Sequence, residues 1–478
     1  MTRSALPRTH LLALVLVLAM FASACGDDAD SADQVIGAPD PTGDGGDGSE
    51  DGGAGWIDGA PDSGDSDDSG DGDASTTGGR SEELDAFVGD EAAPSSLEPP
   101  IDPPPPTNEP LRAGSINDAD DVKGYLDYRD SIMSAGVQVR PLDVTDSTVF
   151  TVIGANGLPV LGAEVLIRDA VSSQADALVT LRTRADGTVR FLPGTLDSSP
   201  AVISVEVLVD GQVTPVDDFT IGTPAVTVEV EADGGFDGSV PLDIVFVIDA
   251  TGSMGDEIDR LRDNMTSVAE QIDALPSSPD VRFGMTVYRD EGDAYVTRTF
   301  DLTDSLADFL DALDDVVANG GGDYPEAMDE ALADAMELPD WRRQEAVQLM
   351  FMLADAPPQV RRDVQQPYTR TATQAAELGM KIFPIAASGT DDQAEYAMRE
   401  LAFVTGGRFV FLAYGGGDSA TGSGTDITTQ DFDELPLDQL VVRLVQDELA
   451  TLTGTDPGDG ETTPTIPPPS TTVPAPDQ

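Results

Sequence analysis

The chain has 478 residues, with 89 Asp or Glu against 25 Lys or Arg, and its formal net charge of −64 repels nucleic-acid phosphates and anionic lipid headgroups. Its single histidine, His10, and its single cysteine, Cys25, leave the rest of the chain without Ser-His-Asp or Cys-His catalysis and without a histidine-ligated zinc site. Neither of the two lysines lies in a G-x-x-x-x-G-K loop, so no P-loop binds nucleotide.

Residues 1–25 have the plan of a secretory signal peptide, with two arginines, an apolar run and small residues before Cys25. The run is too short to cross a membrane as a helix. Cys25 resembles the lipidated cysteine of a bacterial lipoprotein. We therefore expect an exported protein, anchored by lipid on the bacterial cell surface or in the periplasm. Ordinary cleavage that leaves a free thiol is the alternative.

Residues 26–110 consist largely of Asp, Gly, Ser and Pro, with too few apolar residues to bury a core. We expect a disordered, self-repelling linker that holds the folded part away from its anchor. Residues 451–478 are rich in Pro and Thr, and we expect a second disordered segment there.

Residues 111–235 are predicted to form a small all-β sandwich module. A short helix within 116–133 leads into its first strand. Turn pairs such as Asn-Gly and Asp-Gly separate short β-type segments, as in hairpins. These segments cover residues 149–153, 163–168, 178–182, 188–192, 202–208 and 226–230. The stretches 156–165 and 185–191 resemble immunoglobulin-like or carboxypeptidase-regulatory-like modules. We interpret the sandwich as a spacer, with a second binding site as the alternative.

Residues 240–450 alternate apolar runs with segments of helical spacing. The run from Ile244 to Ile248 has no polar interruption and predicts a central strand that is covered on both faces of a parallel sheet. Further strands are predicted at 281–288, 347–354, 381–387 and 408–412, with an edge strand at 295–300. The pattern predicts an α/β fold with a doubly wound, mostly parallel sheet. A chain that starts near Gly235 is expected to fold alone.

Three acidic loops are predicted to converge on one rim. The first and third lie at the carboxyl ends of strands, where open α/β sheets bind ligands, and the second breaks a helical segment. The central strand ends at Asp249, and Thr251 and Ser253 follow at alternate positions. A Gly-rich break leads to Glu326, and the strand 347–354 ends at Asp355. Carboxylate and hydroxyl oxygens suit a hard cation such as Mg²⁺. The first loop alone would be interpreted as a turn and helix cap; the two later loops favour a metal site.

With these motifs in order, residues 241–450 resemble a von Willebrand factor A domain. Asp249, Thr251 and Ser253 match its D-x-S-x-S metal-ion-dependent adhesion site, with Thr in place of the first Ser. The second loop resembles the D-x-P-E loop of integrin beta subunits. The resemblance implies Mg²⁺ or Mn²⁺ at these three residues, with Glu326 as a direct ligand and Asp355 as the third-loop carboxylate.

The integrin-like pattern also implies auxiliary sites, with Ca²⁺ as their expected ion. Asp256 and Glu257, at the start of the first helix, match an adjacent site, and Asp323 matches a residue of another. The acidic loop 290–293 would extend the rim, although such charge clusters are more often solvated.

Together with the signal segment and the composition, the resemblance favours a cell-surface lipoprotein that is not an enzyme. Its A domain would bind a protein, or another carboxylate-bearing partner, whose Asp or Glu completes the coordination of the cation. The alternative is a metal-assisted hydrolase, or an accessory domain of an envelope enzyme. Crowding of the cation by residues from outside the three loops would favour that alternative.

Overall fold

The computed structural model describes residues 55–58, 112–172, 176–196, 200–236, 238–322, 324–360, 364–413 and 435–454. Cys25, Asp323, most of the predicted linker and most of the predicted tail lie outside these ranges. Within them, no helix is both long enough and apolar enough to cross a membrane.

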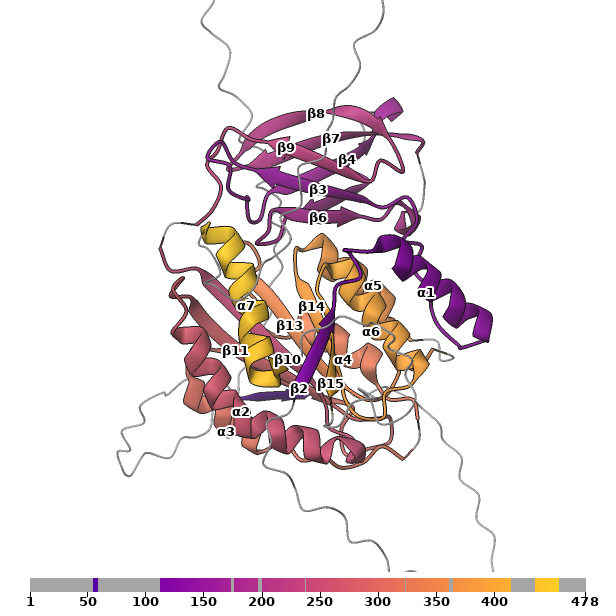
Figure 1. Ribbon diagram of the computed structural model, residues 1–478, viewed down its shortest axis with the longest axis vertical. Helices are drawn as coiled ribbons and strands as arrows, with labels where there is room; N and C mark the ends of the chain where they lie inside the picture. The colour runs from indigo at the N-terminus through magenta and orange to yellow at the C-terminus, as the bar shows by residue number, and fades with distance from the viewer. Residues whose placement is uncertain are drawn as a thin grey trace, which may run out of the picture. The chain divides into compact units, whose positions relative to one another are not determined.

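A nine-stranded sheet lies at the centre of the described α/β domain (Figure 1). In spatial order its strands are β1 (Trp56–Asp58), β12 (Thr297–Thr303), β11 (Asp280–Tyr288), β10 (Pro241–Asp249), β13 (Val347–Ala354), β14 (Lys381–Ala386), β15 (Phe409–Ala413), β2 (Arg112–Ile116) and β16 (Leu435–Pro436). The five adjacent strands β11, β10, β13, β14 and β15 run parallel to one another. Each pairing that involves β1, β12, β2 or β16 is antiparallel. The domain therefore has the predicted doubly wound α/β fold.

Strand β10 is the centre of this arrangement. It pairs along its length with β11 on one side and with β13 on the other, both parallel. The chain moves from β10 outward to β11, and later returns to the opposite side of β10 with β13. The carboxyl end of β10 is therefore a topological switch point, where open α/β sheets bind ligands.

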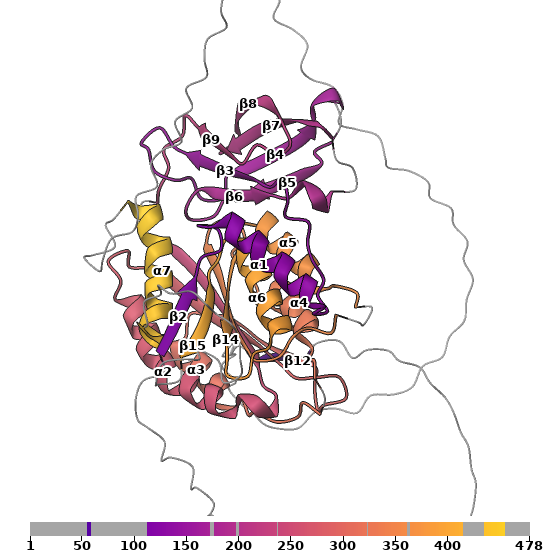
Figure 2. The same ribbon diagram turned by 45° about the vertical axis from the view of Figure 1, so that its right-hand side comes forward.

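Helices cover both faces of the sheet (Figures 1 and 2). Alternate residues of β10 point to opposite faces, so that Phe246 belongs to one buried cluster and Val245 to the other. The first cluster lies under α2 (Gly255–Asp273), α3 (Leu306–Asp314) and α7 (Leu437–Thr453). The second lies under α1 (Val122–Ala135), α4 (Met328–Glu337), α5 (Tyr368–Glu377) and α6 (Asp392–Thr405).

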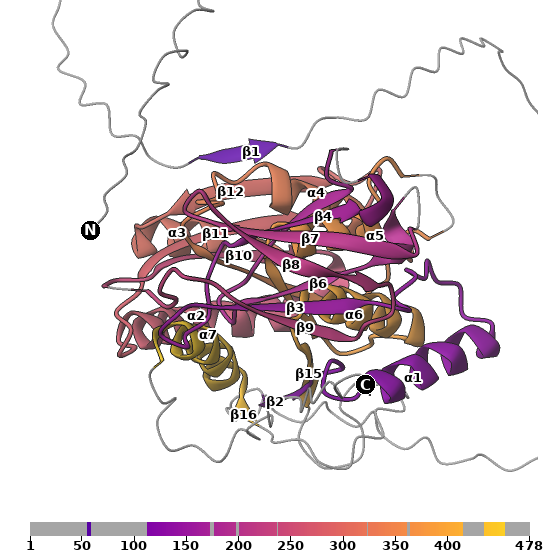
Figure 3. The same ribbon diagram turned by 90° about the horizontal axis from the view of Figure 1, so that it is seen from above.

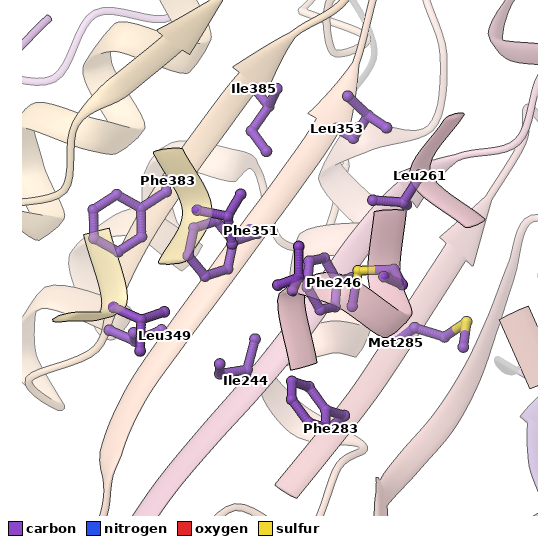
Figure 4. Packing of buried hydrophobic residues seen from close by; sticks show 14 of the residues in the cluster. Ile244, Phe246, Leu261, Phe283, Met285, Leu349, Phe351, Leu353, Phe383 and Ile385 are labelled. Carbon is purple, nitrogen blue, oxygen red and sulfur yellow. The ribbon is translucent and has the colours of Figure 1, made fainter. Parts of the chain in front are cut away.

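Figure 4 shows a row of aromatic side chains on the first of these faces. Phe246 of β10, Phe351 of β13 and Phe383 of β14 stack in sequence, with ring centroids 5.7 Å and 5.1 Å apart. All three are at most 3% exposed, and burying one such side chain stabilises a fold by about 2–3 kcal/mol. This packing fixes the positions of β10 and β13, the two strands that lead to the first and third predicted metal loops.

The sheet takes β2 and the helix α1 from residues before the predicted range 240–450. β2 pairs with β15. Arg129 of α1 donates hydrogen bonds to Glu400 at 3.1 Å and to Tyr396 at 3.0 Å, both on α6. A chain that starts near Gly235 would lack both elements, which argues against the expectation that it folds alone. The helix expected within 116–133 is shorter at its start, because Asp121 caps it by accepting from the Gly124 N–H at 2.9 Å.

Residues 148–229 form two further sheets, whose buried side chains make one cluster. We call them the two-sheet module. The first sheet has β6 (Thr188–Phe191), β3 (Thr148–Ile153) and β9 (Ala225–Glu229), and the second has β5 (Val179–Arg182), β4 (Glu164–Asp169), β7 (Val202–Val209) and β8 (Gln212–Thr220). Each of the six segments predicted from the sequence overlaps one of these strands. β8 was not predicted, because Pro215, Asp217 and Asp218 interrupt its pattern.

Candidate functional site

The first loop of the site begins at the last residue of β10. Asp249 is fully buried, and its Oδ1 accepts from the N–H of Thr251 at 2.9 Å and from the Thr251 hydroxyl at 2.7 Å. The Thr251 hydroxyl also lies 3.4 Å from the hydroxyl of Ser253, which is exposed. The loop therefore places one carboxylate and two hydroxyl oxygens in a connected group. The second carboxylate oxygen, Oδ2 of Asp249, is buried and has no hydrogen-bond partner.

The second loop packs directly on the first. The Gly252 N–H donates to the carbonyl of Gly320 at 3.2 Å. Gly321 has a φ of +70°, and a Cβ there would lie 2.8 Å from Oε1 of Glu326 and 2.9 Å from Cβ of Thr251. Only glycine fits this position, since the conformation is left-handed and the space is filled. Gly321 thus brings the backbone of the second loop between Thr251 and Glu326.

The third loop supplies Asp355, directly after β13. Its carboxylate is 8% exposed, and the Ser253 hydroxyl hydrogen-bonds to it. Asp355 is also a charged neighbour of both Asp249 and Glu326. The structure therefore brings together all five residues that the sequence predicted for the primary site.

Like charge and burial dominate this group. Burial, followed by the charge of Asp355, raises the pKa of Asp249 to about 7. Burial, followed by Asp249, Asp290, Asp293 and Asp355, raises the pKa of Glu326 to about 8. Burial is also the main cause that raises the pKa of Asp355. The charged groups that raise these three pKa values are all acidic, so the carboxylates destabilise one another's ionised forms.

These residues fit a hard divalent cation. Oδ2 of Asp249, Oε2 of Glu326 and Oδ1 of Asp355 are all buried without a hydrogen-bond partner. An unpaired buried carboxylate oxygen is costly, and a cation would relieve that cost at all three positions. In the described part of the chain, no three carboxylates, histidines or cysteines form a ready-made ligand set by themselves. The donor set at this rim instead mixes carboxylates with the hydroxyls of Thr251 and Ser253.

The residues of the predicted auxiliary sites are placed differently. Asp256 is exposed at the start of α2, whereas Glu257 is buried and accepts from the Ser388 hydroxyl at 2.5 Å. The charge of Glu257 acts on Asp355 and contributes to the rise of its pKa. Asp323 lies outside the described residues. Among these three, Glu257 is therefore the one that the structure connects to the primary rim.

A fourth loop, between β11 and β12, supports the second one. Asp293 accepts from the N–H of Gly321 at 2.9 Å and from that of Asp290 at 3.2 Å. Asp290 is only 3% exposed. The acidic segment 290–293 was expected to be solvated. Glu291 is exposed as expected, but the expectation is wrong for Asp290, which is buried, and for Asp293, whose carboxylate holds two backbone N–H groups beside the rim.

Two residues that contribute to the site, Tyr288 and Arg140, were not predicted from the sequence. The hydroxyl of Tyr288, the last residue of β11, is buried next to Asp249, which it neighbours in the strand register. Arg140, from the segment between α1 and β3, donates to Asp329 at 2.9 Å and to the carbonyl of Gln359 at 2.8 Å. Both contacts join residues that are distant in the sequence.

Residues 243–416 match the family model described as the von Willebrand factor type A domain. This part of the chain is a von Willebrand factor A domain. The match covers the first and third loops and Glu326, and it agrees with the doubly wound fold around β10.

Two relatives are similar to parts of the chain. The putative ariadne-like RING finger protein R811 of Acanthamoeba polyphaga mimivirus is 28% identical over 134 residues, which are 28% of this chain and 13% of that protein. The alpha-protein kinase vwkA of Dictyostelium discoideum is 29% identical over 118 residues, 24% of this chain and 18% of that protein. The chain thus spans less than a fifth of the length of either relative.

A similar solved structure is that of the pilus adhesin SpaC from Lactobacillus rhamnosus GG. It is 12% identical, with a TM-score of 0.31, over 53% of this chain and 33% of that chain.

Proposed function

We propose that the A domain binds Mg²⁺ or Mn²⁺ at its rim and, through this cation, a carboxylate of a protein partner. The ligand set is Asp249, Thr251, Ser253, Glu326 and Asp355. The observation that carries the proposal is that three buried carboxylates act on one another electrostatically, and that each has an oxygen that lacks a hydrogen-bond partner. Calcium at Asp256, Glu257 and Asp323 is not part of the proposal.

The residues of the rim have separate tasks in this function. Asp249 provides the central negative charge, and its Oδ1 orients the Thr251 hydroxyl. Ser253 is the exposed member and lies at the side of the rim that a partner reaches. A bound cation supplies positive charge that attracts a partner's Asp or Glu. Without it, the same carboxylate would meet only repulsion from Glu326 and Asp355.

The rim favours docking over hydrolysis. Asp290 and Asp293 come from outside the three loops, but the hydrogen bonds that Asp293 accepts come from backbone N–H groups and hold the second loop in place. We therefore propose an interaction module and not a metal-assisted hydrolase or an accessory domain of an envelope enzyme. The two-sheet module, which the sequence likens to immunoglobulin-like modules, would serve as a spacer.

We also propose that the protein is exported and anchored by a lipid on Cys25. If so, the full chain partitions into detergent after expression in a bacterium, and Cys25→Ala does not. Equal partitioning of the two proteins would contradict the anchor and leave the cation site unaffected.

Calorimetric titration of magnesium into the full chain tests the cation site. We expect one site in the wild type and no detectable binding by Asp249→Ala, because the central charge is lost while the apolar residues of β10 remain. The matched control is Asp263→Ala, which removes the same charge from an exposed position on α2. In thermal unfolding, magnesium at a hundred times its Kd should stabilise the wild type and the control by about 2.7 kcal/mol.

The partner is tested in the same way. Affinity capture from envelope extract should retain a partner in magnesium and release it in chelator, and Asp249→Ala should capture none. Equal magnesium binding by Asp249→Ala and the wild type, or undiminished capture in excess chelator, would show that these residues are only turn and cap residues.

A further inference from the structure

One strand of the large sheet comes from the acidic segment that precedes the domain. β1 pairs antiparallel with β12, so that residues 56–58 lie in register with residues 300–298. Figure 3 shows β1 along the outer side of β12. Without β1, β12 would be the terminal strand that the sequence predicted, with an unpaired edge of backbone N–H and C=O groups.

The side chains of β1 alternate as those of a docked strand do. Trp56 is partly buried and packs against the same hydrophobic cluster as Phe246. Its ring meets that of Phe300 edge to face, with centroids 5.9 Å apart and an interplanar angle of 63°. Ile57 points the other way and is 38% exposed. Trp56 is therefore the anchor of the strand.

The composition of the acidic segment makes this docking specific. Within residues 26–110, the only aromatic residues are Trp56 and Phe87. Small residues flank the anchor, with Gly55 before it and Gly59 after Asp58, so no bulky neighbour keeps the backbone away from β12. Three paired residues provide few hydrogen bonds, so a free peptide would bind weakly, and the covalent connection raises its effective concentration at the edge.

We propose that the outer edge of β12 is a docking site for a short extended segment with one aromatic residue, and that Trp56–Asp58 of the same chain occupies it. The occupant shields the edge from pairing with other chains.

The fluorescence of Trp56 in the full chain tests the docking. The chain has two tryptophans, and Trp341 is buried. The spectrum of Trp56→Ala subtracted from that of the wild type therefore isolates Trp56. We expect this difference signal to be blue-shifted and several-fold less sensitive to acrylamide than that of a free peptide of residues 53–60. Phe87→Ala, which removes the other aromatic residue of the segment, should leave the signal unchanged. A signal as accessible as that of the free peptide would overturn the proposal.

A fluorescein-labelled peptide of residues 53–60 tests whether the edge is filled by the same chain. It should bind to full-length Trp56→Ala, whose edge is open, and several-fold more weakly to the wild type and to Phe87→Ala. A peptide with Ala in place of Trp should bind to none of them. Equal binding to the wild type and to Trp56→Ala would refute occupation by the chain's own segment. Shielding of Trp56 that rises with protein concentration, together with a dimer in sedimentation, would assign the occupant to a second copy and also refute it.

Discussion

Each end of β10 carries a fully buried aspartate, and the two carboxylates differ in the charge of the groups around them. At the amino end, Asp243 receives two hydrogen bonds from Arg282, at 3.0 and 2.9 Å, and two from Arg342, at 2.9 and 2.8 Å. At the carboxyl end, Asp249 accepts hydrogen bonds from Thr251 of its own loop and lies next to the Tyr288 hydroxyl, and the charged neighbour that raises its pKa, Asp355, is acidic.

The difference separates structural charge from functional charge. A buried carboxylate is stable in a fold when arginines surround it, as at Asp243. The fold tolerates Asp249 without such partners because the packing of β10, β11 and β13 stabilises the strand that carries it. We therefore interpret the ion pairs of Asp243 at the amino end as stabilising the sheet, and the carboxyl end as a binding site that an external cation completes.

The largest effect is expected at the amino end. Asp243→Asn removes the charge that two arginines share, so their guanidinium groups lose their buried partner. We expect a loss of about 3–5 kcal/mol in the free energy of unfolding. The loss should be equal in magnesium and in chelator, as measured by denaturant titration in both. A loss that magnesium restores would mean that the two ends of β10 are not independent.

In the absence of metal, replacing the aspartate at the carboxyl end of β10 should raise the free energy of unfolding, whereas replacing Asp243 lowers it. The pKa of Asp249, about 7, lies above the value of about 3.8 that an unfolded chain has. Between these pH values the folded protein binds more protons than the unfolded chain, so its stability falls as pH rises from about 4 to about 7. Asp249→Asn removes the group that causes this fall.

We therefore expect Asp249→Asn to unfold at higher denaturant concentration than the wild type in chelator at pH 8, by at most about 4 kcal/mol. The advantage should shrink as pH falls toward 4. Saturating magnesium should reverse the order, because only the wild type gains from it. A variant that is less stable than the wild type in chelator at every pH would show that Asp249 has a structural role like that of Asp243.

The sequence reveals the carboxyl end far better than the amino end. The apolar run before Asp249 and the local spacing of Thr251 and Ser253 predict the strand and its loop, since both patterns lie within ten residues. Nothing near Asp243 predicts its pairing with Arg282 and Arg342, because those contacts depend on how distant segments pack.

The same reason explains the strands that the sequence missed. β1 and β2 have three and five residues, too few to show a period, and each pairs with a strand more than two hundred residues away. The support from Asp293 was also hidden, since an acidic loop in so acidic a chain is ordinarily solvated. Local patterns therefore predicted the candidate ligands, and distant contacts provided the groups that hold their loops.

The smallest effect is expected from replacing Arg140, which is distant in the sequence from the loops that it joins. Its guanidinium binds Asp329 at the start of α4 and the carbonyl of Gln359 in the third loop, and Gln359 in turn donates to the carbonyl of Pro325 at 2.6 Å. Arg140 thus joins the loops that carry Glu326 and Asp355. Arg140→Gln should let these loops separate and weaken magnesium binding by about tenfold, or about 1.4 kcal/mol.

The matched control is Arg168→Gln, which removes an equal charge from the two-sheet module, where Arg168 pairs with Glu206 at 3.6 Å. Both variants remove one positive charge, but the two arginines lie at different places in the structure, so the long-range effect of the lost charge on magnesium differs between them. Calorimetry at several ionic strengths separates the cases. A positional effect leaves a constant difference between the variants, whereas screening of a long-range charge makes the difference vanish at high salt. If the two variants bind magnesium equally at low salt, Arg140 stabilises the fold but does not position the rim, and the metal loops are held by the Gly321 and Asp293 contacts alone.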